Sequence, residues 1–121
     1  MTVIELLEKI LNDVHNTGGV EASAVASRDG LLIYSTLPQK QHAETFAAMS
    51  ATMLGAAETT STELGKGIPE RVVVESKEGK LVVTGAGPRA LLIIMTEPDA
   101  GLGLILVEVE KASEKIKNIL G

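Results

Sequence analysis

A run of six consecutive apolar residues, Ala90–Met95, sets the tightest limit on the fold. A strand with one face in solvent alternates apolar and polar residues, because successive side chains point to opposite faces. This run is apolar at every position, which predicts a strand covered on both faces. It is far shorter than the roughly twenty residues that span a bilayer. We therefore expect a central strand of a sheet, with helices on both sides.

Turn residues predict antiparallel neighbours for this strand. Asp29-Gly30 separates two runs of strand-forming residues and is typical of a tight hairpin with a type I′ turn, in which both central residues have positive φ. A second turn is predicted at 77–80, and a third at Gly87-Pro88 leads into the apolar run. The predicted strands before that run are Glu21–Ser27, Leu31–Thr36, Arg71–Ser76 and Leu81–Gly85.

Helices are expected at both ends of the chain. Thr2–Val14 has apolar residues at helical spacing, and Thr2 with Glu5 forms a capping box. The C-terminal segment is ambiguous, because Leu104–Glu110 alternates like a strand while apolar residues from Leu102 onward also follow helical spacing. We favour a helix that begins near Leu102. The element order is then α-β-β-α-β-β-β-α, within a single domain over 1–121.

The long middle helix, His42–Lys66, carries most of the information about function. One stripe of small and apolar residues comprises Ala43, Ala47, Ser50, Leu54, Ala57, Ser61 and Leu64. A second stripe on an adjoining face comprises Phe46, Met49, Met53, Ala56 and Thr60. A helix on the surface of a domain needs only one apolar stripe. Either both stripes belong to one large core, or the second one meets another chain; we favour the second interpretation, because Met and Phe are enriched at interface cores.

Composition argues against several classes of partner and location. Eleven basic and sixteen acidic residues give a net charge of −5, and Tyr34 and Phe46 are the only aromatic residues. The chain therefore lacks the positive field and the stacking rings that hold nucleic acid. There are no cysteines, which fits a reducing compartment. Met1–Glu5 does not resemble the start of a signal peptide. We expect a cytoplasmic protein without direct membrane insertion.

Several motifs invite a catalytic or cofactor-binding interpretation and do not support it. Gly85–Ala90 resembles a dinucleotide fingerprint, but it leads into a strand instead of a helix. Gly65-Lys66 lacks the first glycine and the Ser or Thr of a phosphate loop. His15 and His42 lie near helix ends, where solvated or capping roles are expected, and Arg28 is expected to be an exposed neighbour of the Asp29 turn. We expect no catalytic residue, no cofactor and no metal site.

Together these features resemble the Roadblock family of dynein light chains, in particular its prokaryotic MglB-like branch. The segments that carry the resemblance are the opening helix, Gly19–Ile33, the small-residue helix at 43–64, and the strand at 90–95 followed by Pro98–Leu104. The resemblance implies a Roadblock-like, profilin-like α/β sandwich. Its five-stranded, mainly antiparallel sheet would carry the middle helix on one face and the terminal helices on the other.

The resemblance also implies a function. Members of the family form dimers through the middle helix and the strand after it, so Val72 and Val74 join Phe46, Met49, Met53, Ala56 and Thr60 as interface candidates. The family regulates or scaffolds Ras-like small GTPases; the chain has no GTPase motif, so the nucleotide would belong to the partner. The expected function is a dimeric, non-catalytic GTPase regulator. The alternative is a cytoplasmic small-molecule sensor of related fold, and an enzyme is the least favoured class.

Overall fold

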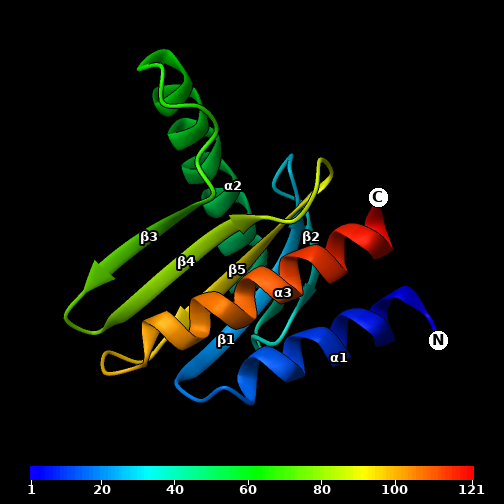
Figure 1. The fold of residues 1–121 in the computed structure, drawn as a ribbon. Coiled ribbons are helices and arrows are strands. Elements are labelled where there is room, and N and C mark those ends of the chain that lie inside the picture. Colours follow the sequence, from blue (N-terminus) through cyan, green and yellow to red (C-terminus); the bar gives the residue numbers. More distant parts are fainter.

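The computed structural model of the protein describes residues 1–121. Its five strands form one sheet in the order β2-β1-β5-β4-β3, and every neighbouring pair is antiparallel. Figure 1 shows the sheet with β5 at its centre and β3 at one edge. The elements are α1 (Val3–His15), β1 (Val20–Ser27), β2 (Leu32–Ser35), α2 (Lys40–Glu63), β3 (Arg71–Ser76), β4 (Gly79–Gly85), β5 (Ala90–Thr96) and α3 (Leu102–Leu120).

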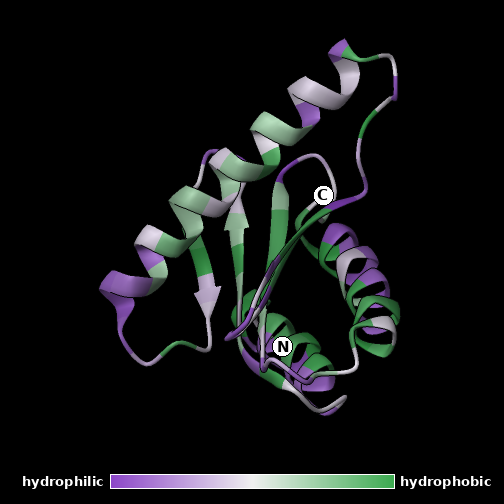
Figure 2. Cartoon of the chain, turned by 90° about the vertical axis from the view of Figure 1, so that its left-hand side faces the viewer, coloured by the Kyte–Doolittle hydropathy of each residue, from purple (hydrophilic) through white to green (hydrophobic).

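Helices cover both faces of the sheet, as the apolar run in β5 predicts. Helices α1 and α3 lie side by side on one face, and α2 lies on the other (Figures 1 and 2). Leu92 and Ile94 point into the core beneath α1 and α3, whereas Leu91 and Ile93 point into the core beneath α2. The predicted fold class is confirmed, and the sheet is antiparallel throughout.

The ambiguous C-terminal segment is a helix, as favoured from its sequence. Ile105, Val109, Ala112 and Ile116 are buried at helical spacing against α1 and the sheet. The opening helix α1 begins with the predicted capping box: Glu5 N–H donates to the Thr2 hydroxyl, and the Glu5 carboxylate accepts from the Thr2 N–H. The order of elements therefore agrees with the sequence, with shifts of a few residues at their ends.

The hairpin between β1 and β2 differs from the expected type I′ turn. Gly30 N–H donates to the Ser27 carbonyl, and Ser27 N–H donates to the Leu31 carbonyl. Gly30 has φ +88°, while no residue other than glycine has positive φ. The loop is therefore a type I turn followed by one left-handed glycine, which lets Asp29 keep ordinary backbone angles. Gly30 also packs on α2, where an added Cβ would lie 3.1 Å from the Ala48 Cα.

Candidate protein-binding surface

The two halves of α2 differ in how they contact the rest of the chain. Ala43, Ala47, Ser50 and Leu54 are the buried residues of this helix, and all lie in its first fifteen positions. The C-terminal part of the helix runs past the sheet, as Figures 1 and 2 show. Burial along the first predicted stripe falls in the same direction, since Leu54 is fully buried whereas Leu64 is 71% exposed. The outer half of α2 therefore has little support from its own chain.

The second predicted stripe is divided in two by the structure. Phe46 and Met53 are half-buried and pack against the core between α2 and the sheet. Met49 is 62% exposed, and Ala56 and Thr60 are exposed as well. Of the second stripe, Met49, Ala56 and Thr60 are thus left free on the surface of α2. Their contact with another chain remains a prediction.

Strand β3 adds an open edge to this surface. It pairs with β4 on one side and has no neighbour on the other. Val72 is half-buried against the core beneath α2, while Val74 on the same face is 41% exposed. Val74 and Phe46 border a groove of about 270 Å³ whose other apolar walls are Leu81 and Met95. The structure therefore brings Val74 of β3 and Phe46 of α2 to one groove, which Val72 does not line.

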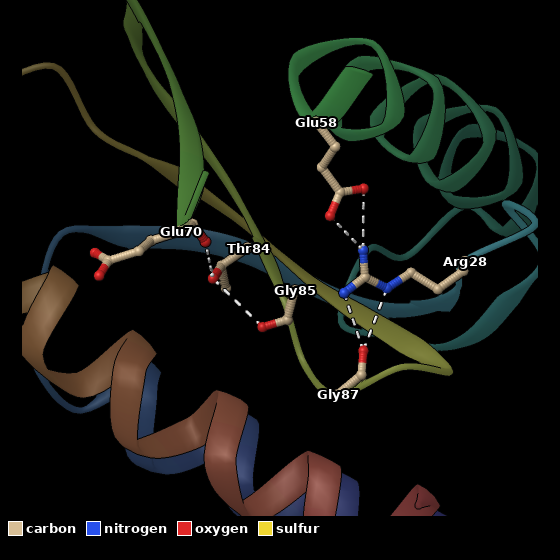
Figure 3. Close-up of polar contacts among 6 residues, drawn as sticks. All are labelled: Arg28, Glu58, Glu70, Thr84, Gly85 and Gly87. Carbon is tan, nitrogen blue, oxygen red and sulfur yellow. Dashed lines mark hydrogen bonds and ion pairs between the residues drawn. The ribbon is translucent and has the colours of Figure 1, made fainter. Parts of the chain in front are cut away.

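A polar clamp that the sequence did not predict ties α2 to the rest of the fold. Both Glu58 carboxylate oxygens accept hydrogen bonds from Arg28 Nη1, at 3.1 and 3.3 Å. Arg28 Nε and Nη2 donate to the Gly87 carbonyl, at 3.3 and 3.0 Å (Figure 3). The guanidinium thus joins the β1–β2 turn, the β4–β5 turn and α2, and each of its three nitrogens donates within the chain. The expectation that Arg28 is an exposed turn residue is wrong.

A glycine makes room for this clamp. A Cβ added at Gly85 would lie 2.5 Å from Arg28 Nη2, so any larger residue would displace the guanidinium. Gly85, the first residue of the stretch that resembles a dinucleotide fingerprint, has this packing role in the structure. Glu58 gave one hint in the sequence, because it is one of few charges on an apolar helix.

The histidines lie apart, as their sequence positions predict. His15 Nε2 lies 2.8 Å from the hydroxyl of the buried Ser23, and burial lowers the pKa of His15. His42 is exposed in the first turn of α2. No three His, Asp or Glu side chains come together in a way that could hold a metal ion. None of the helices is long and apolar enough to cross a membrane.

The larger grooves lie on the surface of the molecule. One is the groove beside Phe46 and Val74, and another of about 340 Å³ lies between α1 and α3 around Ile10 and Ile119. A shallow one of about 390 Å³ lies beside the end of α2, between Thr59 and Ile68. Buried, mostly aliphatic side chains lie between the sheet and the helices on both faces. The arrangement offers surfaces and an open sheet edge, which suit another polypeptide better than an enclosed small molecule.

A family model described as the Roadblock/LC7 domain matches residues 6–96. This chain belongs to the Roadblock/LC7 family. The uncharacterized protein MJ1340 of Methanocaldococcus jannaschii is 37% identical over 93% of this chain and 97% of its own length. Among solved structures, "MglB with tetrameric arrangement" has a TM-score of 0.89 at 21% identity, covering 98% of this chain and 90% of that one.

A second MglB structure agrees with the first. The gliding protein MglB of Thermus thermophilus has a TM-score of 0.87 at 22% identity, over 98% of this chain and 91% of that chain. At such identities the likeness is one of fold. It confirms the resemblance to the MglB-like Roadblock proteins that the sequence indicated, from the opening helix to α3.

Proposed function

We propose that this Roadblock/LC7 protein is a self-associating, non-catalytic regulator or scaffold that binds a Ras-like small GTPase in the cytoplasm. One observation carries the proposal: the exposed side of α2, with Met49, Ala56 and Thr60, lies on the same side of the sheet as Val72 and Val74 of the open-edged β3. The family resemblance supplies the kind of partner, and the MglB structure described as tetrameric supports self-association.

The outer half of α2 gives a physical reason for a partner. Most of the stability of a helix in a protein comes from packing its apolar face, since propensity alone is weak. The stretch after Leu54 has no buried residue and includes Gly55, Thr59, Thr60 and Thr62, all of low helix propensity. Contact with a second chain would supply the packing that this half lacks.

The arginines of the chain bear on how a GTPase would be affected. An arginine finger must be free to reach the phosphates of a partner. Arg28 is held by Glu58 and the Gly87 carbonyl, and Arg71 contacts Glu70 at 3.5 Å. The third arginine, Arg89, is exposed in the β4–β5 turn and makes no ion pair within the chain. Unless Arg89 reaches the nucleotide, any effect on hydrolysis would act by repositioning catalytic residues of the GTPase itself.

Self-association is tested by light scattering with two matched substitutions. We expect the wild-type chain to be a dimer or larger at micromolar concentration, and Met49→Glu to yield monomers because it places a charge in the contact. Val107→Glu, at a half-exposed position on α3, makes the same kind of change on the opposite face and should leave the assembly intact. Met53 is less suitable, because it packs on the chain's own core. A monomeric wild-type chain would overturn this part of the proposal.

The GTPase partner is tested separately. The Ras-like GTPases encoded in the same genome would each be loaded with GDP or with a non-hydrolysable GTP analogue and titrated with the wild-type chain. We expect one of them to bind in a nucleotide-dependent manner, and Val107→Glu to bind equally well. If none binds in either state, the GTPase part of the proposal is wrong, whatever the assembly state.

A further inference from the structure

The C-terminal end of α1 is tied to the sheet by hydrogen bonds among polar residues. His15 Nε2 lies 2.8 Å from the hydroxyl oxygen of Ser23 on β1, and that hydroxyl has no other hydrogen-bond partner. The Ser23 N–H donates to Thr36 Oγ1 at 2.8 Å, and the Thr36 hydroxyl donates back to the Ser23 carbonyl at 3.2 Å. The end of α1, the middle of β1 and the residue after β2 are thus joined at one point.

This contact lies at the rim of the core beneath α1 and α3. Ser23 is fully buried, whereas His15 is half-buried. A buried hydroxyl that loses its partner costs free energy, because water cannot replace the lost hydrogen bond. The last turns of α1 also cover Leu11 and Val14, which belong to this core. The position of the imidazole therefore affects both the Ser23 hydroxyl and the helix end that covers this part of the core.

We propose that His15 and Ser23 form a proton-sensitive latch, which holds the end of α1 on the sheet while the imidazole is neutral and loosens it when the imidazole is protonated. The latch acts within one chain and does not depend on the function proposed above. A neutral imidazole shares one hydrogen bond with Ser23 and brings no charge to the core rim. A protonated imidazole must either keep its charge partly out of water or turn to solvent and leave the Ser23 hydroxyl unpaired.

The sheet offers a protonated His15 no counterion. Ser23 and Val25 of β1 face α1, and neither of them carries a charge. The titratable residue of β2 on this face is Tyr34, whose phenol is neutral because burial and the nearby Glu8 raise its pKa. His15 takes part in none of the ion pairs of the chain.

The helices and loops around His15 offer no counterion either. Glu8 and Asp13 of α1 are exposed, and Asp13 lines the groove toward α3. The other charged side chains on elements near α1 are Glu21 of β1, Glu97 and Asp99 in the loop before α3, and Glu108, Lys111 and Lys115 on the α1 side of α3. None of these carboxylates forms an ion pair with His15. Burial without a counterion lowers the pKa of His15.

The direction of the pH effect follows from this lowered pKa. A freely solvated His15 takes up its proton near the ordinary value of 6.5, whereas in the closed latch it does so only at lower pH. Above about pH 6.5 the imidazole is neutral in both states, and the latch contributes its full stability. As the pH falls below that value, the open end of α1 binds a proton that the closed one does not, so opening becomes easier by up to about tenfold for each unit of pH. Below the lowered pKa the effect levels off.

Nuclear magnetic resonance tests the first step on the unmodified chain. The ring protons of His15 are followed from about pH 8 to about pH 4, in the folded chain and in the chain unfolded by urea. The chain has two histidines, so His42→Gln leaves a single signal and assigns it. We expect His15 to titrate at lower pH in the folded chain than in the unfolded one. An equal or higher titration point in the folded chain would overturn the latch.

Single cysteines locate the opening, because the chain has none of its own. Val14→Cys and Leu7→Cys place a thiol beneath the last turns and the first half of α1, at almost fully buried positions. Asn12→Cys places one at an exposed position, and its labelling by a maleimide corrects for the effect of pH on the thiol itself. Relative to that control, labelling of Val14→Cys should rise by up to about tenfold for each unit of pH below about pH 6.5, while labelling of Leu7→Cys should stay unchanged.

His15→Gln is the matched variant for this measurement. Glutamine can hydrogen-bond to Ser23 and does not titrate, so in this background the corrected labelling of Val14→Cys should no longer depend on pH. His42→Gln removes the exposed imidazole of α2 instead and should leave the rise intact. An equal rise at positions 7 and 14 would indicate general loosening in acid, and a rise that persists in His15→Gln would assign the proton to another group. Either result, or no rise at all, would contradict the latch.

Discussion

The two faces of the sheet are built differently. The core beneath α1 and α3 contains 14 buried residues, while the core beneath α2 contains seven, three of them alanines. Helices α1 and α3 bury large aliphatic residues at helical spacing over most of their length, for example Leu7 and Leu11 in α1 and Ile105 and Ile116 in α3. Helix α2 is the longest helix and buries only Ala43, Ala47, Ser50 and Leu54.

The difference indicates that the two faces contribute unequally to the stability of the chain. Burial of large aliphatic side chains supplies most of the free energy of folding, so the α1–α3 face carries most of the stability of the chain. The small residues of α2 fill less volume but allow close approach of another helix. Together with the unpaired edge of β3, they leave apolar surface and backbone groups for a partner. One face serves folding, and we propose that the other serves association.

The largest expected effect tests this division with one substitution on each helix. Ile105→Ala opens a cavity in the core beneath α3 and should lower the free energy of unfolding by about 2–5 kcal/mol. Leu64→Ala, at the exposed C-cap that follows α2, should change it by less than about 0.5 kcal/mol. Denaturant titration at concentrations low enough to keep the chain monomeric measures both. A similar loss for the two variants would show that the outer half of α2 stabilises the isolated chain.

A smaller effect is expected from the Arg28 clamp. Arg28→Ala leaves Glu58 and the Gly87 carbonyl without their donor, and because both charged side chains are about one-third exposed the cost should be about 1 kcal/mol. Hydrogen exchange should quicken in the outer half of α2 and stay unchanged in α1 and α3. Arg89→Ala, an exposed arginine of the β4–β5 turn, is the control. Unchanged exchange in α2 would mean that the clamp does not hold the helix.

The sequence predicts the fold well, because the fold depends on local patterns. Each of these patterns can be recognised within a short segment of the sequence. They are the apolar run in β5, the hairpin residues, and the helical spacing of apolar residues in α1 and α3. The prediction of a type I′ turn for the first hairpin is wrong. The pattern Asp29-Gly30 fits both a two-residue loop and a three-residue loop with one left-handed glycine, and the structure has the second.

The candidate surface was predictable only in part. The stripes of α2 followed from spacing, but their division into half-buried Phe46 and Met53 and exposed Met49 depends on where the sheet ends beneath the helix. The contact of Arg28 with Glu58 joins residues thirty positions apart, which no local pattern encodes. Such features depend on tertiary geometry, and they also shape the proposed contact surface.

The smallest expected effect comes from replacing one glycine on each face by alanine and comparing the stability of the two variants. Gly55 in α2 and Gly103 in α3 each have open space where a Cβ would lie. Alanine at either position should stabilise the monomeric chain by about 0.5–1 kcal/mol, because it restricts the unfolded chain and favours the helix. Thermal or denaturant unfolding of the dilute protein measures this gain.

The two variants should differ in assembly. If a second helix packs closely against α2, the methyl group of Gly55→Ala lies in the contact and weakens the dimer, although it stabilises the monomer. Gly103→Ala lies on the folding face and should leave the dimer dissociation constant unchanged. Sedimentation across a dilution series separates the two effects. Gly55→Ala could instead strengthen the dimer in proportion to its gain in helix stability. In that case the association surface of α2 does not include Gly55, and a second helix approaches α2 nearer Met49.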